Sequence, residues 1–346
     1  MISTKDFEQK QIIYVLLDEG ECISFKNDNI IIKDKDENTK LQTTCYRLFA
    51  VFVCGHFTLT SGIFERAKKF GFTLVLLSHS MKVSAIIPAR TEGNVLLRRV
   101  QYNYEDFEIA AQITANKIHN SLAQLKKIRG KSEKAKEVIA KLKDNAKQVQ
   151  ESGLSLAQIM GFEGVSAKMY FEVLFSEYSW TARRPRVKHD AINCLMDIGY
   201  TMLFNVVNGI AELFGFDTYV GVLHREFYNR KSLICDLVEP FRVIVDAAIL
   251  KMLNLGQVHE KDFYINQKQY TLFGKNAVPY TQNMLKAILE WKNEIFFYIQ
   301  CYYRAFVRQK PISEYPVFDS DTAEVRCGTN KDEKLEKVND NASGEL

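Results

Sequence analysis

The stretch from Asp190 to Phe214 reads DAINCLMDIGYTMLFNVVNGIAELF, and its apolar residues recur at helical spacing. The same spacing recurs in three further stretches: Ser155–Ser179, Asp236–Leu253 and Asn283–Lys310. Proline is scarce in this part of the chain, and leucine, alanine and lysine, which favour helices, are common. The sequence therefore predicts that the chain is mostly α-helical beyond about residue 91.

The first 90 residues carry a different pattern. Strand-forming residues run through Ile12–Leu17 and Leu48–Val53, and a turn signal at Lys26–Asp28 separates two shorter strands. Thr60 and Ser61 are typical of the start of a helix, and Gly71 is typical of its end. We expect several antiparallel strands and one helix, which together form a small β-rich domain.

These patterns predict an α+β chain with three segments. Residues 1–90 form the small β-rich domain, and residues 91–318 form a larger all-α domain that carries the chemistry. Residues 319–346 are polar and lack the apolar residues that folding requires, so they are predicted to be a disordered tail. The length of 346 residues is sufficient for two domains.

Composition limits the class of protein. The net charge is only +4, so local clusters of charge, not the total, must indicate any nucleic-acid partner. Seven cysteines without a Cys-x-x-Cys pair or a zinc-like spacing predict free thiols in a reducing cytosol. The longest strongly apolar run, Leu48–Leu59, is too short to cross a bilayer, and the charged N-terminus does not resemble a secretion signal. We expect a soluble cytoplasmic protein with no membrane partner.

Two carboxylates lie close together in the segment Asp236-Leu237-Val238-Glu239-Pro240. At a spacing of three, Asp236 and Glu239 share one face of a helix. Such a pattern is typical of a helix N-terminus, with one acid at the cap, one in the first turn and a proline beside it. Taken alone, the segment favours this capping interpretation, although the same carboxylates could also face an ion.

Two other residues favour the ion. Glu163 lies in a helical stretch between Gly161 and Gly164, and paired glycines in a helix suggest that another backbone or a ligand comes close. His224 lies three positions after Gly221, near a predicted break between helices. Each residue alone reads as an ordinary surface or core residue. Together with Glu239 and the neighbouring Asp236, they form a His-plus-carboxylate set that suits Mg²⁺ or Mn²⁺.

Basic residues surround the proposed metal ligands. A cationic loop, Arg183-Arg184-Pro185-Arg186, lies between the Glu163 and His224 segments, and further arginines follow His224. Solvated charge explains any one such cluster, but clusters on both sides of an acidic set are better explained by a bound polyanion. The residues expected to contact phosphates are Arg184, Arg186, Arg225 and Arg242.

Several other chemistries lack their sequence signatures. The chain contains no nucleotide-binding P-loop, no Gly-x-Ser-x-Gly elbow, no His-Glu-x-x-His pair and no Rossmann glycine fingerprint. A divalent ion can polarise a phosphate and activate an attacking hydroxyl without any of these motifs. The residues therefore predict metal-dependent chemistry on nucleic-acid phosphates.

Four ordered segments resemble the CRISPR-associated Cas1 family, the endonuclease/integrase of spacer acquisition in antiviral defence. They are Gly161–Phe171, the arginine-rich loop Arg183–Asp190 with its helix through Gly199–Leu203, Gly221–His224, and Ser232–Arg242. The N-terminal half matches more loosely, through Thr60–Phe70 and Leu96–Gln101, and the likeness spans about residues 10–310.

The resemblance implies specific roles. Glu163, His224 and Glu239 match the metal ligands of the family, and Asp236 matches an acid beside the metal that supports catalysis. It also implies a homodimer, and two such dimers joined by a small ferredoxin-like Cas2 subunit in a hetero-hexamer. The expected partners are double-stranded DNA, as captured spacer DNA and as the CRISPR repeat.

Three functions remain open at this point. The first is a metal-dependent DNA integrase that joins 3′-hydroxyl ends of captured DNA to the repeat by transesterification. The second is a generic metal-dependent nuclease on branched or single-stranded nucleic acid, which uses the same ligands but yields only shorter fragments. The third is a non-catalytic DNA-binding scaffold whose acids merely cap a helix.

Overall fold

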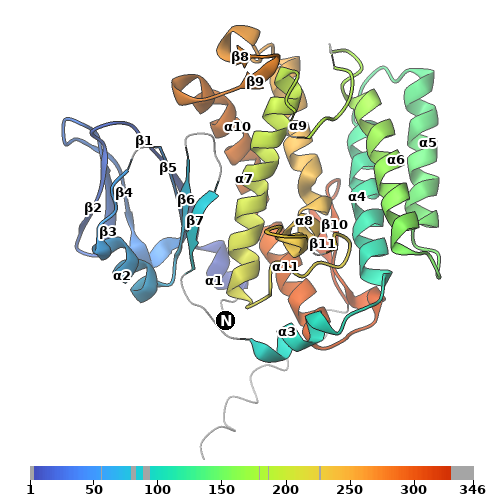
Figure 1. Cartoon of the computed structure of the whole chain (residues 1–346), viewed down its shortest axis with the longest axis horizontal. Coiled ribbons are helices and arrows are strands. Elements are labelled where there is room, and N and C mark those ends of the chain that lie inside the picture. Colours follow the sequence, from blue (N-terminus) through green and yellow to red (C-terminus); the bar gives the residue numbers. More distant parts are fainter. Residues whose placement is uncertain are drawn as a thin grey trace, which may run out of the picture.

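A computed structural model of the chain describes residues 4–55, 57–78, 83–88, 94–178, 180–185, 187–225 and 227–328. Two small sheets lie at one side of the molecule, and long helices fill the rest (Figure 1). The predicted class is confirmed, because a β-rich N-terminal region precedes a helical region. The predicted boundary near residue 90 stays a prediction, and residues 89–93 are outside the described part of the chain.

The first sheet is mixed. Its strands, in spatial order, are β1 (Gln11–Leu17), β5 (Leu48–Gly55), β6 (Thr73–Leu77) and β7 (Val83–Ile87). Strand β5 runs parallel to both of its neighbours, and only β6 and β7 are antiparallel, so the predicted antiparallel arrangement is wrong for this sheet. Helix α2 (Ser61–Phe70) joins β5 to β6. A nearly continuous buried strand followed by a helical crossover is the usual setting of parallel pairing.

The second sheet is antiparallel as predicted. It consists of β2 (Cys22–Lys26), β3 (Asn29–Lys33) and β4 (Thr39–Thr44). Asn27 and Asp28 form the tight turn between β2 and β3 with φ angles of 48° and 58°, which asparagine and aspartate tolerate better than most residues. A short helix, α1 (Thr4–Glu8), precedes the sheets, and one 3₁₀ turn, η1 (Cys45–Arg47), precedes β5.

The helical region holds the elements that build the site. In chain order its helices are α3 (Val95–Tyr102), α4 (Glu108–Lys126), α5 (Glu133–Gln148), α6 (Leu156–Leu174), α7 (Ala191–Leu213), α8 (Ser232–Leu237), α9 (Arg242–Asn254), α10 (Ala277–Glu290) and α11 (Lys292–Val307). The predicted single helix over Asn283–Lys310 is in fact the end of α10 and all of α11, which meet at Trp291. A 3₁₀ turn, η2 (Glu239–Phe241), connects α8 to α9.

Short elements complete the described chain. A hairpin of β8 (Tyr264–Asn266) and β9 (Gln269–Thr271) lies between α9 and α10. The remaining 3₁₀ turns are η3 (Glu260–Asp262), η4 (Gly274–Asn276) and η5 (Ile312–Glu314).

The segment predicted to be a disordered tail from residue 319 contains a strand that reaches residue 326. Strands β10 (Val317–Asp319) and β11 (Glu324–Arg326) form a hairpin, and the ring of Phe318 at its start is fully buried. The Asn116 side chain exchanges hydrogen bonds with the Phe318 backbone, and Asn120 Nδ2 donates to the Phe318 carbonyl at 3.0 Å and to the Pro240 carbonyl at 3.1 Å. One buried aromatic ring and three hydrogen bonds to its backbone thus fix a segment whose composition is polar. Residues 329–346 are outside the described residues.

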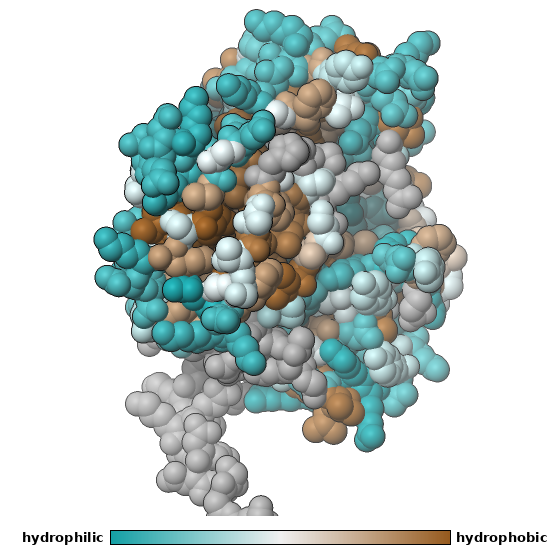
Figure 2. Space-filling view, turned by 60° about the vertical axis from the view of Figure 1, so that its left-hand side comes forward, coloured by the Kyte–Doolittle hydropathy of each residue, from teal (hydrophilic) through white to brown (hydrophobic). Residues whose placement is uncertain are grey.

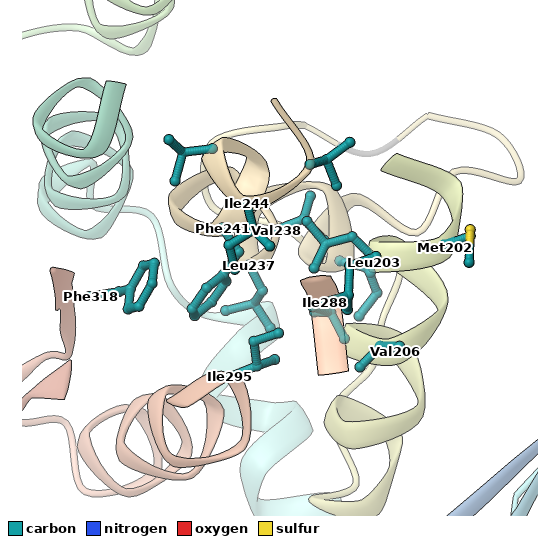
Figure 3. Close-up of a cluster of buried hydrophobic side chains, with 14 of the residues drawn as sticks. Met202, Leu203, Val206, Leu237, Val238, Phe241, Ile244, Ile288, Ile295 and Phe318 are labelled. Atoms are coloured by element: carbon teal, nitrogen blue, oxygen red, sulfur yellow. The ribbon is translucent and has the colours of Figure 1, made fainter. Parts of the chain in front are cut away.

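One hydrophobic core links the helices and the first sheet. The Phe7 ring stacks on Phe296 with centroids 4.0 Å apart and meets Phe49 of β5 edge-on at 4.7 Å. Deeper in the core, side chains of α7, α10 and α11 and of β10 converge on the α8–α9 segment, where Leu237, Val238 and Phe241 are buried (Figure 3). The turn that carries Glu239 therefore rests on a tightly packed base.

Two features bear on the predicted cytoplasmic location: one apolar helix and one exposed apolar region. Helix α7 alone, among the described residues, is long and apolar enough to cross a membrane, but 78% of its apolar window is buried inside the molecule, as in the core helix of a globular fold. Figure 2 shows an exposed apolar region, rimmed by hydrophilic residues, on the side of the molecule that carries the sheets.

Candidate active site

A cavity of about 390 Å³ lies between α4, α6, α7 and the α8–α9 segment. Three of the predicted site residues, Glu163, His224 and Glu239, line it, and the fourth, Asp236, bonds directly to His224. The other charged or hydroxyl-bearing side chains of its wall are Lys117, Ser121, Ser166, Tyr170, Arg183, Tyr200, Arg230, Arg242 and Asp246. The structure thus gathers residues from sequence segments far apart into one pocket.

The carboxyl groups of Glu163 and Glu239 converge on one point. Lys117 of α4 occupies this point, and its ammonium group pairs with Oε1 of Glu163 on α6 and lies 2.6 Å from Oε2 of Glu239 on η2. Its side chain is 15% exposed. Two carboxylates that share one cation are close enough to reach a common metal ion.

Glu239 is the most constrained of these groups. The residue is 3% exposed, and its Oε1 atom accepts from Nη2 of Arg242 at 2.9 Å. Burial alone would raise the pKa of this carboxyl, but the cations of Arg242 and Lys117 outweigh burial and lower the pKa to about 2. Glu239 is therefore ionised at neutral pH. Despite the nearby ammonium, its buried Oε2 has no hydrogen-bond partner of good geometry among the described residues.

Asp236 is fully buried and organises the loop before α8. Its Oδ2 atom accepts from the backbone N–H groups of Val222 and Leu223 at 2.6 and 3.0 Å. Its Oδ1 atom accepts from the backbone N–H of His224 at 2.9 Å and contacts the His224 ring at Nδ1, 2.7 Å away. A proton on Nδ1 donates to this carboxylate, so Nε2 presents its lone pair on the other side of the ring. Asp236 thereby sets the orientation of His224.

The capping interpretation of these acids is wrong. Asp236 bonds the loop 222–224 and no N–H of its own helix, and neither η2 nor α9 has a side-chain cap. Gly221 explains how the loop comes so close, because a Cβ there would lie 2.6 Å from the His224 carbonyl oxygen and 2.7 Å from Oδ2 of Asp236. The burial of Asp236 raises its pKa, against the lowering effect of the His224 hydrogen bond.

A second buried acid lies at the other end of the cavity. Asp246 of α9 is 2% exposed and accepts from the hydroxyl of Tyr200 at 2.5 Å and from that of Tyr170 at 3.1 Å. Burial raises its pKa to about 6, since neutral hydroxyls lower the pKa of the carboxyl less than burial raises it. The Arg242 guanidinium lies over the Tyr200 ring, 4.8 Å from its centroid, so it spans the two ends of the pocket.

The glycines beside Glu163 have a different setting from the one expected. A Cβ at Gly161 or Gly164 would meet no atom of the described chain within 4 Å, so no backbone of this chain packs there. This face of α6 is exposed beside the pocket, and Met160 and Val165 are exposed on the same helix.

The predicted phosphate-binding arginines are dispersed. Only Arg242 lines the cavity, where it pairs with Glu239. Arg184 is exposed, as is Arg225, whose guanidinium lies 5.5 Å from the Phe107 ring centroid. Arg186 lies outside the described residues. Arg183 and Arg230, which were not selected from the sequence, do line the cavity.

The donor set suits a divalent ion by its chemistry. Two carboxylates from different helices meet at one point, an oxygen of Glu239 lacks a hydrogen bond, and His224 is oriented through Nδ1. In the part of the chain that the structure describes, no three His, Cys, Asp or Glu side chains stand together as a ready metal cage. The Lys117 ammonium lies between two of the three predicted ligands.

Sequence reasoning missed two members of the site. Lys117 is the only charged residue in the segment Thr114–Ile118, whose other members are buried, and Asp246 interrupts the apolar run Val243–Ile249. A charge placed on the buried face of a helix was the available signal, because burying a charge costs free energy unless a partner stabilises it.

Comparison with known proteins gives consistent matches. The family model "CRISPR associated protein Cas1" matches residues 14–284. A CRISPR-associated endonuclease Cas1 from Chlorobaculum tepidum is 28% identical over 269 residues, which cover 72% of this chain and 76% of the relative. One from Leptospira interrogans is 29% identical over 244 residues, covering 64% of this chain and 93% of the relative.

Solved structures share the fold. A Cas1 protein from Thermotoga maritima superposes with a TM-score of 0.71 at 19% identity, over 85% of this chain and 97% of that one. A casposase bound to its integration product superposes with a TM-score of 0.71 at 20% identity, over 95% of this chain and 99% of the other. A family model that spans most of the chain, together with these relatives, establishes that the protein is a member of the CRISPR-associated Cas1 family.

Proposed function

We propose that this chain is a metal-dependent DNA integrase of CRISPR spacer acquisition. One observation carries the proposal: the carboxyl groups of Glu163 and Glu239, from α6 and η2, meet at a single cation in a cavity that His224 also lines. Relatives are named endonucleases, and a structural neighbour is a casposase bound to its integration product, which supports DNA strand chemistry.

Glu163, His224 and Glu239 hold the ion in this proposal. A bound Mg²⁺ or Mn²⁺ supplies Lewis-acid polarisation of the phosphate and makes an attacking hydroxyl more acidic. Arg242 keeps Glu239 ionised and in place through the pair at Oε1, and Asp236 keeps Nε2 of His224 turned toward the cavity. These contacts support a donor set that combines a residue of α6, a residue of η2 and a histidine of the loop before α8.

The reaction exchanges one phosphodiester bond for another. The 3′-oxygen of captured DNA forms a bond to a phosphorus atom of the repeat while the bond to the repeat's own 3′-oxygen breaks. The proton of the attacking hydroxyl is released, and the departing oxygen takes one up. Because the number of phosphodiester bonds is unchanged, the step needs no nucleotide triphosphate.

The assembly is part of the same proposal. A structural neighbour with a TM-score of 0.73 belongs to a "Cas6-RT-Cas1–Cas2 complex", in which the matching region is 36% of that chain. We propose that this protein works in the cytoplasm as a homodimer, and that two dimers join a Cas2 subunit in a hetero-hexamer that binds double-stranded DNA. The exposed apolar region on the side of the sheets offers a surface for contact between chains (Figure 2).

A joining assay tests the proposal. Supercoiled plasmid with a CRISPR repeat, short duplex DNA and Mg²⁺ or Mn²⁺ are incubated with the protein, with and without the Cas2 subunit. Joined strands are expected from the wild type, and neither Glu163→Ala nor Glu239→Ala should yield them, although both should still bind DNA. Wild-type joining by either variant, or joining that survives a chelator, would refute the assignment.

A second candidate is hydrolysis alone, which the name "endonuclease" of the relatives favours. The same residues would then direct water instead of a 3′-hydroxyl at the phosphate. The products separate the two, since a nuclease leaves only shorter fragments. The hypothesis of a non-catalytic DNA-binding scaffold has less support, because Asp236 and Glu239 do not cap a helix among the described residues.

A further inference from the structure

Lys117 occupies the position that the proposed ion requires. It comes from α4, which supplies none of the predicted ligands, and its ammonium contacts oxygens of both Glu163 and Glu239. The N–O distance to Glu239 is 2.6 Å, and Mg²⁺ holds its oxygen ligands at about 2.1 Å. The ammonium and a divalent ion cannot contact the same two oxygens at once.

The charges of this cluster cancel. Glu163 and Glu239 carry two negative charges, and Lys117 and Arg242 carry two positive ones. Because Glu239 is almost completely buried, its charge needs cations nearby to offset the loss of hydration. Arg242 pairs with Oε1 and Lys117 lies against Oε2, so each oxygen of this carboxylate has its own cation.

A divalent ion would leave the cluster with two positive charges in excess. The ammonium must then leave the carboxylates, and the remaining acid of the cavity wall, Asp246, already accepts from two tyrosines. Arg230 lines the same cavity, pairs with no acid among the described residues and adds to the positive charge, whereas Arg183, which also lines it, is paired with Asp197 at 2.6 Å. A phosphodiester is the anion that this excess attracts.

We propose that Lys117 is an exchangeable cation: it balances the two carboxylates until the ion replaces it, and it then contacts the phosphate of the bound DNA. The proposal rests on the metal site proposed above. It predicts two effects of opposite sign when the lysine is removed. Metal binding becomes tighter because a competitor is lost, and joining becomes slower because the phosphate loses a cation.

Lys117→Met keeps the length of the side chain and removes its charge. Titration calorimetry with Mn²⁺ alone, on protein freed of metal with a chelator, should show at least tenfold tighter binding than in the wild type. Joining at saturating Mn²⁺ should fall at least tenfold. In thermal unfolding, the metal-free variant should melt below the wild type, and saturating Mn²⁺ should raise its midpoint by more.

The matched control is Lys134→Met. Lys134 of α5 also pairs with a glutamate of α6, Glu172, but Lys134 is exposed, Glu172 is half-buried, and both are outside the cavity. This variant should match the wild type in Mn²⁺ affinity and in joining. Lys117→Gln carries the same predictions as Lys117→Met if the methionine variant does not fold.

Each outcome bears on one of the two proposals. Unchanged or weaker Mn²⁺ binding by Lys117→Met overturns the exchange, and tighter binding with unchanged joining overturns the contact with phosphate. Glu239→Ala provides the separate test of the metal site. If Glu239→Ala binds Mn²⁺ as tightly as the wild type, the proposed function fails first, and this inference fails with it.

Discussion

The two ends of the candidate-site cavity hold buried acids whose pKa values shift in opposite directions. Glu239 is 3% exposed and Asp246 is 2% exposed, so burial alone would affect their pKa values similarly. The pKa of Glu239 is nevertheless lowered to about 2, and that of Asp246 is raised to about 6. Direct contact makes the difference, because Arg242 and Lys117 pair with the Glu239 carboxylate itself. The same cations also lower the pKa of Asp246, but its hydrogen bonds come from the hydroxyls of Tyr170 and Tyr200, and burial prevails.

This difference in pKa indicates that Glu239 and Asp246 have different roles within one pocket. The end that holds Glu239 keeps a permanent negative charge, which a metal ion needs. The end that holds Asp246 ties α6, α7 and α9 together through hydrogen bonds from two tyrosines, and it tolerates a neutral acid. If charge at Glu239 and hydrogen bonding at Asp246 are separable, substitutions at the two residues should have different effects.

Glu239→Gln should have the largest effect. The substitution keeps the shape but removes the buried charge that pairs with the half-buried cations of Lys117 and Arg242, so the free energy of unfolding should fall by about 3–5 kcal/mol. Joining should drop below detection. Denaturant unfolding and the joining assay measure both. Asp246→Asn is the control, and an equal loss of stability at pH 8 in both variants would contradict the distinction between the two ends.

Asp236→Asn should reduce joining by roughly 10–100-fold, as removal of an outer partner of a metal-ligating histidine usually does. An asparagine can accept from the loop N–H groups only through its one amide oxygen, so both the loop 222–224 and the His224 ring lose part of their support. Mn²⁺ affinity, measured by calorimetry, should fall with joining. A variant that joins slowly but binds Mn²⁺ normally would show that Asp236 acts on something other than His224.

The pH dependence of stability should separate the two acids by sign. The folded protein keeps a proton on Asp246 up to about pH 6, whereas the unfolded carboxyl releases it near 3.8, so this contribution to stability is lost as the pH rises from about 4 to 6. Glu239 contributes above 4.5 and loses its contribution as the pH falls toward about 2.

Asp246→Asn should therefore gain stability relative to the wild type across pH 4 to 6, by up to about 3 kcal/mol. Urea unfolding of both proteins at several pH values measures this gain. A constant difference between them over the whole range would show that the acid does not titrate in this window.

The smallest effect is expected from Lys143 and Lys147, two lysines of a second groove that pair with no acid among the described residues. A groove of about 470 Å³ on the far side of α4 is lined by Lys126, Lys143, Lys147 and Arg326. Among the described residues no acid pairs with Lys143 or Lys147, although their neighbours on α5, Lys136 and Lys141, each pair with a glutamate. Unpaired cations are free to contact phosphates, unlike Arg242 at Glu239.

The double variant Lys143→Ala/Lys147→Ala should weaken DNA binding modestly. The slope of log affinity against log salt should fall by roughly 2, with little change in joining at saturating DNA. Lys136→Ala is the paired control and should leave the slope unchanged. An unaltered slope in the double variant would mean that DNA does not reach this groove.

The sequence predicted the fold class, because helical periodicity is a local property. It also selected Glu163, His224 and Glu239, which the structure places around one cavity, and their role as metal ligands stays a prediction. It could not predict the parallel pairing of β5, which depends on strands far apart in the chain, although the uninterrupted apolar run Leu48–Val53 was a signal for it. The resemblance placed Asp236 beside the metal, but its bonds to Val222 and Leu223 could not be predicted, since these partners are backbone groups of a separate loop. Lys117 lies too far along the chain from either glutamate for spacing to reveal the contact.

The hairpin of β10 and β11 sets a limit for protein engineering. Its Phe318 ring packs 4.6 Å from that of Phe241, and Asn120 binds Phe318 and Pro240 together, so the last described strands hold the turn that contains Glu239. Affinity tags or fusion partners belong after residue 328, and a truncated protein that ends before residue 317 would lose the packing that supports the turn with Glu239.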